Sequence, residues 1–263
     1  MLRRRQYELT NWSVPGPLEP IPLLLYHRSD IAGPKPPVVY YHGVAQSKET
    51  YVDSHPIARQ LADLGMLVAL PDAPGHGDRP SAVKLIERLR SSLPREFTAD
   101  IEQAAEEAPA LAHWVRNRPN ASGSRMAVIG TSMGGFTAAA VAGRLGEQLR
   151  TAVCIAGSGD LPGCYSQTDS IRQDGWGPSD RSMDEETTRR VERIDPIRHP
   201  DQYESVPMLV LHGSRDTWNP PATSIRFGEV VPAAQVRVIP GAVHWPPSAA
   251  IVDAAVTWLR DHV

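Results

Sequence analysis

The chain has 263 residues, a length that suits one large α/β domain or a domain carrying a small insert. A hydrophobic content of 41% allows a substantial core, and a formal net charge of −3 argues against a nucleic-acid surface, which needs a basic excess. No apolar run approaches the ~20 residues of a membrane span, and no apolar segment follows the basic start as in a signal peptide. We therefore expect a cytoplasmic protein with neither nucleic-acid nor membrane partners.

The two cysteines fit a reducing compartment. Cys154 lies in an apolar, strand-like run and is expected to be a small core residue, whereas Cys164 falls in a polar stretch expected to be a loop. Nothing in the sequence demands a disulfide between them, so the cytoplasm is the expected location.

Short apolar runs alternate with helical patterns along the chain. Strands over 7–14 and 21–27 are joined by a turn-rich segment and are expected to pair antiparallel. Six further strands are expected at 38–41, 66–70, 126–129, 151–156, 208–211 and 236–239. Helices are expected at 57–64, 82–90, 101–118 with a kink at Pro109, 136–145, a segment capped by Asn219, and 248–262. This order predicts one α/β domain over 1–263, with an eight-stranded, mostly parallel sheet covered by helices on both faces.

One segment departs from this alternation. Residues 158–206 are polar, rich in glycine and proline, and too long for a plain loop. We expect them to form a small cap, inserted after the sixth strand and lying over the carboxyl edge of the sheet.

The segment 130–135 reads Gly-Thr-Ser-Met-Gly-Gly and lies between an apolar strand and an Ala-rich helix. A G-x-S-x-G turn in that context presents its serine, here Ser132, as a nucleophile. Because the turn is strained and crowded, Gly130 and Gly134 are expected to have no room for a Cβ atom. The N-terminus of the following helix adds free N–H groups and a partial positive charge at the same place.

An acid and a base follow two other strands. Asp216 comes after the strand at 208–211, and His244 comes after the strand at 236–239. Ligands of open α/β sheets bind at the carboxyl ends of the strands, so both residues are expected to meet Ser132 there. His244 would take the serine proton and Asp216 would orient the imidazole. Asp160 and Asp195 are weaker alternatives for the acid.

An anion site should accompany these groups. Two backbone N–H groups usually stabilise the negatively charged oxygen of acyl transfer. We expect them to come from Met133, directly after the serine, and from Val44, in the loop after the strand at 38–41.

Other chemistries lack their motifs. The chain contains no G-x-x-x-x-G-K-[ST] loop, no C-x-x-C pair and no H-E-x-x-H helix. We therefore expect no nucleotide, no catalytic metal and no other cofactor.

With these residues in place, the chain resembles the α/β-hydrolase superfamily over nearly its full length. More narrowly, it resembles small bacterial carboxylesterases related to dienelactone hydrolase and to the catalytic domain of prolyl oligopeptidases. The resemblance rests on Tyr41-His42-Gly43, the run Leu-Pro-Asp-Ala-Pro-Gly-His-Gly-Asp-Arg at 70–79, the turn at Ser132, and Leu-His-Gly ahead of Asp216. It implies ester hydrolysis through an acyl-serine intermediate without a cofactor. Dienelactone hydrolase itself has a cysteine at the turn, so its substrate is not implied.

The resulting hypothesis is a serine carboxylesterase that acts on a small-molecule ester. The cap is expected to wall the substrate pocket, although the same side chains could merely pack the cap onto the domain: Leu161, Tyr165, Ile171, Trp176 and Met183. A peptidase, thioesterase or acyltransferase would use the same triad, and the fold also occurs in proteins that only bind ligands.

Overall fold

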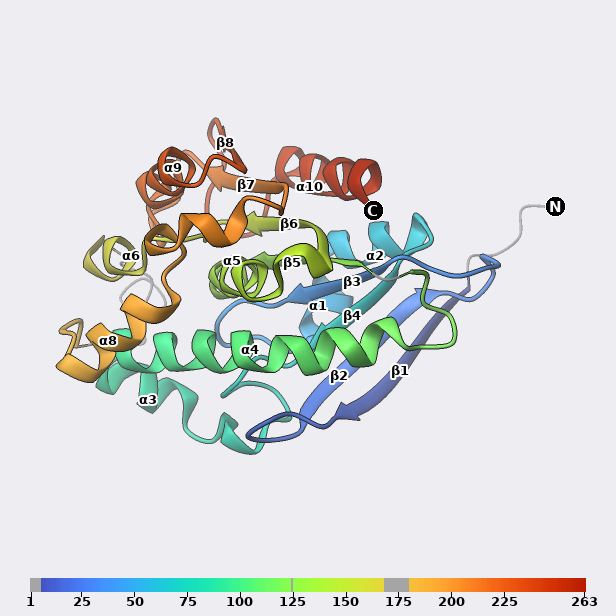
Figure 1. Ribbon diagram of the computed structural model, residues 1–263, viewed down its shortest axis with the longest axis horizontal. Helices are drawn as coiled ribbons and strands as arrows, with labels where there is room; N and C mark the ends of the chain where they lie inside the picture. The colour runs from blue at the N-terminus through green and yellow to red at the C-terminus, as the bar shows by residue number, and fades with distance from the viewer. Residues whose placement is uncertain (1–5, 124, 168–179) are drawn as a thin grey trace.

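A single eight-stranded sheet forms the centre of the computed structural model, which describes residues 6–123, 125–167 and 180–263 (Figure 1). The strand order is β1-β2-β4-β3-β5-β6-β7-β8. β2 is antiparallel to β1 and β4, and the remaining neighbours are parallel, which confirms the expected mostly parallel sheet. The strands are β1 Tyr7–Val14, β2 Ile21–Arg28, β3 Pro37–Tyr41, β4 Leu67–Pro71, β5 Met126–Thr131, β6 Leu149–Ile155, β7 Met208–Gly213 and β8 Ala234–Ile239.

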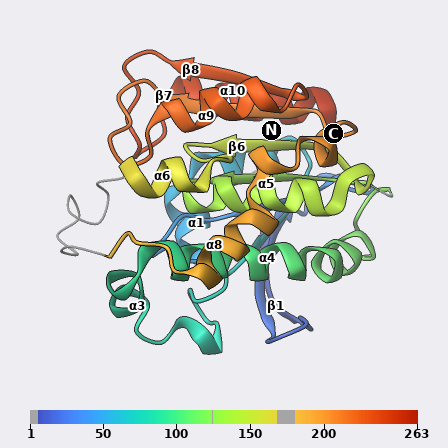
Figure 2. The same ribbon diagram turned by 60° about the vertical axis from the view of Figure 1, so that its left-hand side comes forward.

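Helices cover both faces of the sheet (Figures 1 and 2). Helices α4, α5 and α9 pack on one face, and α1, α2 and α10 pack on the other. The helices are α1 Lys48–Ser54, α2 Pro56–Asp63, α3 Leu85–Ser91, α4 Leu93–Arg116, α5 Met133–Leu145, α6 Leu161–Gln167, α8 Glu185–Ile194, α9 Pro221–Val230 and α10 Ala249–His262. Short 3-10 turns lie at Pro80–Ala82, Gly146–Gln148, Pro196–Arg198 and Pro200–Tyr203.

The central strands read as continuous apolar runs because both of their faces are buried. In β5, Val128 belongs to the core under α4 and α5, whereas its neighbours Ala127 and Ile129 belong to the core under α2 and α10. Successive side chains of a strand point to opposite faces, so one strand supplies both cores. The loops after β3, β5 and β7 therefore begin at strands whose side chains are buried on both faces, and the loop after β8 begins at an edge of the sheet.

Several local expectations were wrong at element boundaries. Helix α4 begins at Leu93, where the Ser92 side chain accepts a hydrogen bond from the backbone N–H of Arg95, and it continues as one helix through Pro109. Helix α3 begins at Leu85, after a separate 3-10 turn.

Asn219 was expected to cap α9 and does not. The N-cap of α9 is Pro220, and the Asn219 amide donates to the carbonyl oxygen of Ala156, just after β6. Cys164 lies in α6 and is 3% exposed, so the expected polar loop is also wrong there. Cys154 and Cys164 are both free thiols.

The segment 158–206 contains α6, α8 and two 3-10 turns in its described part. Helix α8 lies against α4, where Arg190 and Arg193 form ion pairs with Glu102. Residues 168–179 lie outside the described residues, so a cap over the sheet edge stays a prediction.

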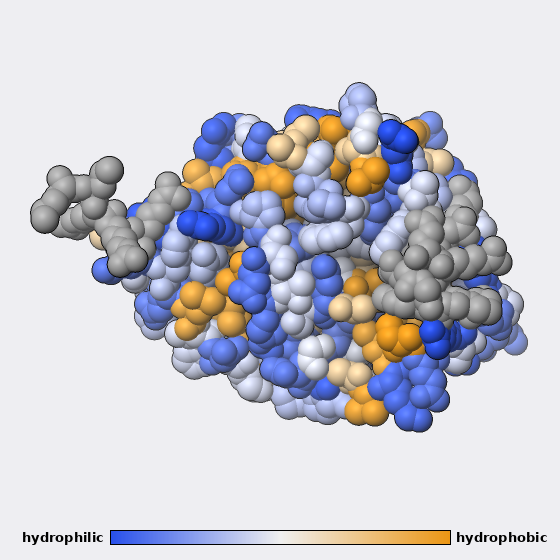
Figure 3. Space-filling view, turned by 180° about the vertical axis from the view of Figure 1, so that it is seen from behind, coloured by the Kyte–Doolittle hydropathy of each residue, from blue (hydrophilic) through white to orange (hydrophobic). Residues whose placement is uncertain are grey.

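The surface seen from behind alternates hydrophilic areas with small hydrophobic patches (Figure 3). Within the described part of the chain, none of the helices combines the length and the apolar character needed to cross a membrane.

Candidate active site

Ser132 stands on a strained turn between β5 and α5. Its backbone has φ 58° and ψ −121°, a conformation that costs an L-residue free energy and persists only where the surroundings enforce it. The surroundings here are backbone atoms: a Cβ on Gly130 would overlap the Gly134 carbonyl, and a Cβ on Gly134 would overlap the Tyr41 carbonyl. The expectation that neither glycine position has room for a side chain is confirmed.

The structure brings Ser132, His244 and Asp216 together. The Ser132 hydroxyl lies 2.9 Å from Nε2 of His244, and Nδ1 of His244 lies 2.8 Å from Oδ2 of Asp216. A carboxylate can only accept, so Nδ1 carries the imidazole proton and Nε2 is free to accept from the serine. This tautomer is the one that a general base needs.

Asp216 is 6% exposed and surrounded by donors. Its Oδ1 accepts from the backbone N–H groups of Trp218 and Asn219, each at 2.9 Å. Burial acts to raise the pKa of Asp216, but hydrogen bonds from His212 and His244 outweigh it and lower the pKa to about 2. The carboxylate is therefore ionised near pH 7.

The weaker alternatives for the acid lie in other contacts. Asp160 pairs with Arg226 and accepts from the backbone N–H of Gly163 at 3.0 Å. Asp195 accepts from the backbone N–H groups of Asp160 and Leu161, at 2.8 and 3.2 Å. Both carboxylates thus organise the start of α6 and make no described contact with His244.

Val44 and Met133, the expected backbone donors, are both close to the nucleophile. Val44 and Ser132 line the same depression, and Met133 is the first residue of α5. The N–H of a first helical residue has no acceptor within its own helix, so it is available to an anion.

The depression at Ser132 has a volume of about 140 Å³. Its lining includes two aromatic side chains that no sequence pattern indicated, Trp218 and Trp245. The Trp218 ring is stacked on His244 with centroids 4.9 Å apart and planes inclined by 20°. A larger depression, of about 240 Å³, lies between α4, α5 and α8, but none of the candidate catalytic side chains lines it.

The expected pocket residues are dispersed. Leu161 and Tyr165 are buried in a cluster that also contains Met133 and, at its margin, Val44. Met183 is 36% exposed. Ile171 and Trp176 lie outside the described residues, so the role of the five in substrate binding stays a prediction.

Comparisons with known proteins show which family the chain belongs to. A family model described as "Prolyl oligopeptidase family" (Peptidase_S9) matches residues 54–249. The chain is 27% identical over 252 residues to "Esterase YjfP" of Escherichia coli (strain K12), with 88% of this chain and 90% of that protein covered.

Two solved structures share the fold. "Crystal structure of puromycin hydrolase" matches with a TM-score of 0.74 and 25% identity, covering 97% of this chain but only 39% of the longer hydrolase. "The structure of DcsB complex with its substrate analogue" matches with a TM-score of 0.70 and 16% identity, covering 97% of this chain and all of that one. At this identity, the second likeness shows the fold alone.

Proposed function

This chain belongs to the prolyl oligopeptidase family and is a serine hydrolase, and on that premise we propose that it is a carboxylesterase of small acyl esters. The observation that carries the proposal is the continuous relay from Ser132 through His244 to Asp216, at 2.9 and 2.8 Å. The esterase relative, which matches this chain over 90% of its own length, supports an ester as the substrate.

The proposed reaction begins at the serine hydroxyl. Oγ of Ser132 attacks the ester carbonyl carbon while its proton passes to Nε2 of His244. The carbonyl oxygen becomes an anion and receives hydrogen bonds from the N–H groups of Val44 and Met133. Asp216 stabilises the imidazolium formed at this moment.

The second half of the reaction restores the enzyme. His244 returns its proton to the alkoxide oxygen, the bond from that oxygen to the carbonyl carbon breaks, and the alcohol departs. Water then loses a proton to His244 and attacks the carbonyl carbon of the acyl-serine. The bond from that carbon to Oγ of Ser132 breaks, His244 returns the proton to Oγ, and the carboxylic acid departs. None of these steps requires a cofactor.

The size and lining of the depression favour a small, uncharged ester. A volume of about 140 Å³ lies below the ~300 Å³ at which drug-sized ligand pockets begin. Trp218 and Trp245 offer flat apolar surfaces to the acyl or the alcohol group. Both cysteines are buried free thiols, which supports the cytoplasm as the proposed location.

A peptidase is the second candidate, because the family and the puromycin hydrolase likeness favour it. We propose to compare kcat/KM for p-nitrophenyl acetate, an acetyl thioester and an aminoacyl p-nitroanilide. Higher activity on the anilide would replace the esterase proposal with a peptidase, and higher activity on the thioester would replace it with a thioesterase.

The nucleophile is tested separately with a fluorophosphonate probe. We expect covalent labelling of the wild type and none of Ser132→Ala, at equal thermal stability. If the folded wild type is not labelled and hydrolyses none of the three substrates, the remaining interpretation is a ligand-binding protein without catalytic activity.

A further inference from the structure

The peptide between Gly43 and Val44 is held in one orientation. Its carbonyl oxygen, on Gly43, lies 2.8 Å from Nδ1 of His42 and 3.3 Å from the backbone nitrogen of Gln46. A peptide bond is planar and trans, so the N–H of Val44 points away from that carbonyl. Whatever fixes the carbonyl of Gly43 therefore fixes the direction of the Val44 N–H.

His42 is itself held from its other side. Its Nε2 accepts from the backbone N–H of Ala73 at 2.9 Å, in the loop after β4. An N–H only donates and a carbonyl only accepts, so the ring carries its proton on Nδ1 and donates it to Gly43. The ring is 1% exposed, and burial lowers the pKa of His42 to about 4, so the ring is neutral near pH 7.

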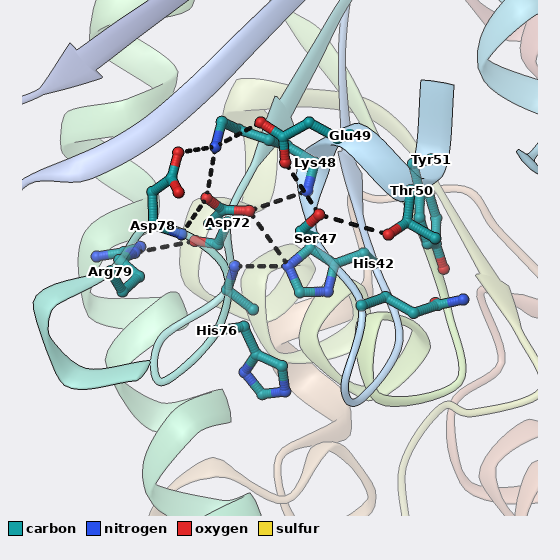
Figure 4. A network of polar contacts seen from close by, with 12 residues as sticks. His42, Ser47, Lys48, Glu49, Thr50, Tyr51, Asp72, His76, Asp78 and Arg79 are labelled. Carbon is teal, nitrogen blue, oxygen red and sulfur yellow. Dashed lines mark hydrogen bonds and ion pairs between the residues drawn. The ribbon is translucent and has the colours of Figure 1, made fainter. Parts of the chain in front are cut away.

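An ion pair fixes the far end of the same loop (Figure 4). The Asp72 carboxylate accepts from the backbone nitrogen of Lys48 at 2.9 Å and from its ammonium at 2.8 Å. Both side chains are buried, and the Asp72 carboxylate also accepts from the backbone N–H of Asp78 at 2.9 Å. The loop from β3 to α1 is thus joined to the loop after β4 at two points, His42 and Lys48.

The loop between these two points is strained and adjoins the nucleophile. Ala45 has φ 57°, which costs free energy for any residue with a Cβ atom. A Cβ built on Gly43 would lie 3.5 Å from Cβ of Ser132, and Gly43, Val44 and Ser132 line the same depression, so the Gly43–Val44 peptide adjoins the nucleophilic residue. Without anchors, rotation of this peptide would turn a carbonyl, in place of an N–H, toward the developing negative charge.

We propose that His42 is a positioning residue for the anion site. By donating from Nδ1 to the Gly43 carbonyl, it directs the Val44 N–H at the oxygen that becomes negative when Ser132 attacks. This inference rests on the proposed function. It assigns to His42 a role in transition-state stabilisation that needs no contact with the substrate.

Two variants of His42 separate this role from packing. The amide nitrogen of Asn takes the place of Nδ1, so His42→Asn retains a donor for Gly43 and loses the acceptor for Ala73. The amide oxygen of Gln takes the place of Nε2, so His42→Gln retains the acceptor and loses the donor. Each variant loses one buried hydrogen bond. If His42 only supported the packing, both variants would therefore show the same loss of activity.

The test measures kcat/KM for p-nitrophenyl acetate and the Kd of phenylboronic acid. Boron accepts an electron pair from Oγ of Ser132 while the serine proton passes to His244, which gives a tetrahedral anion like the transition state. Loss of one anion-site donor lowers turnover ~10²–10³-fold, and Gln46 still holds the carbonyl, so we expect about 10- to 100-fold losses in His42→Gln. The Kd of phenylboronic acid should rise by a similar factor while KM changes little, and His42→Asn should stay closer to the wild type in both.

Tyr203→Phe is the matched control. Tyr203 is also buried, and its hydroxyl donates to the Ala139 carbonyl oxygen at 3.1 Å, so the substitution removes the same kind of hydrogen bond away from the Gly43–Val44 peptide. It should lower the Tm and leave the boronate Kd at the wild-type value. A boronate Kd that rises as much in Tyr203→Phe as in His42→Gln would contradict the proposal.

The remaining outcomes also test the positioning role of His42. Equal losses in the two folded His42 variants, or none in either, would overturn the positioning role while leaving the esterase proposal intact. If His42→Gln does not fold, a folded His42→Asn with a loss as deep as about 100-fold overturns the role, because its amide still reaches Gly43. A wild type that neither hydrolyses esters nor binds the boronate would remove the proposed function, and this inference with it.

Discussion

Nε2 of His212 lies 3.1 Å from Oδ2 of Asp216, so one carboxylate oxygen faces two imidazole rings. Nε2 of His212 also lies 2.7 Å from the Asn219 carbonyl oxygen, which can only accept, so His212 carries its proton there and donates to both groups. Its other nitrogen, Nδ1, lies 2.7 Å from the Ser224 hydroxyl. Asp216 is therefore held as an acceptor on every side, which fixes its orientation toward His244.

Asp216→Asn is expected to lower kcat by about 10⁴-fold, because an amide cannot accept from both rings and stabilises the wrong tautomer of His244. The measurement is the hydrolysis rate of p-nitrophenyl acetate, with circular dichroism to establish folding. Asp160→Asn is the control, since Asp160 pairs with Arg226 away from the site. If Asp160→Asn lost the activity and Asp216→Asn kept it, the acid would be Asp160.

Gly134→Ala is expected to cost about 3 kcal/mol or more in the free energy of unfolding, because overlap with backbone cannot be relieved by rotating a side chain. The added Cβ would overlap the Tyr41 carbonyl and lie 2.7 Å from the His42 carbonyl oxygen. Urea unfolding measures the cost. Gly33→Ala is a control for backbone strain alone: Gly33 has φ +89° and open space around its Cβ position, so about 1–2 kcal/mol is expected there. A cost for Gly134→Ala no larger than for Gly33→Ala would refute the steric account of the turn.

The sheet could be predicted because each strand is marked by a pattern in its own short stretch of sequence. Strands such as β5 are short apolar runs bounded by turn residues, and burial on both faces makes the runs continuous. Ser132, Asp216 and His244 were found by the same means, since each follows a strand end and parallel strands carry their carboxyl ends to one edge. That these three residues lie close together could therefore be expected without knowing how any helix packs.

The missed features depend on contacts between distant segments. Helix α1 shows no apolar periodicity over its polar sequence, and its first residue, Lys48, is anchored by Asp72, a neighbour only in the folded chain. Asn219 carries a strong local capping signal, yet its amide satisfies the carbonyl of Ala156 instead. The aromatic lining by Trp218 and Trp245 likewise arises from the paths of two loops, which no spacing in the sequence encodes.

Trp218→Ala is expected to raise KM for p-nitrophenyl esters about tenfold, which corresponds to the loss of roughly 1.4 kcal/mol of contact free energy. The ring lines the depression and is stacked on His244, so kcat should also fall as the imidazole loses its support. Trp114→Ala is the matched control, because Trp114 is also half-buried but packs on Trp12 and Arg118. Steady-state kinetics of the pair should show a change of KM in Trp218→Ala alone; an unchanged KM there would exclude Trp218 from the substrate site.

Asp100→Asn is expected to stabilise the protein more at pH 8 than at pH 5. Asp100 is 5% exposed, and its Oδ2 has no hydrogen-bond partner among the described residues. Burial, only partly offset by the charge of Arg88 at 3.1 Å, raises the pKa of Asp100 from its ordinary value of 3.8 to about 7. The folded state therefore binds a proton more tightly than the unfolded state does, and stability is lost as the pH rises from about 4 through 7, the reverse of the contribution of Asp216.

The size of this effect follows from the shift in pKa. Each unit corresponds to about 1.4 kcal/mol, so removal of the carboxylate should yield a gain about 2–3 kcal/mol larger at pH 8 than at pH 5. The amide oxygen of Asn still accepts from Arg88, so the packing at this site is preserved. Urea unfolding of both proteins at the two pH values measures the difference. An equal change at pH 5 and pH 8 would mean that Asp100 is ionised in the folded protein throughout this range, with Arg88 compensating its burial in full.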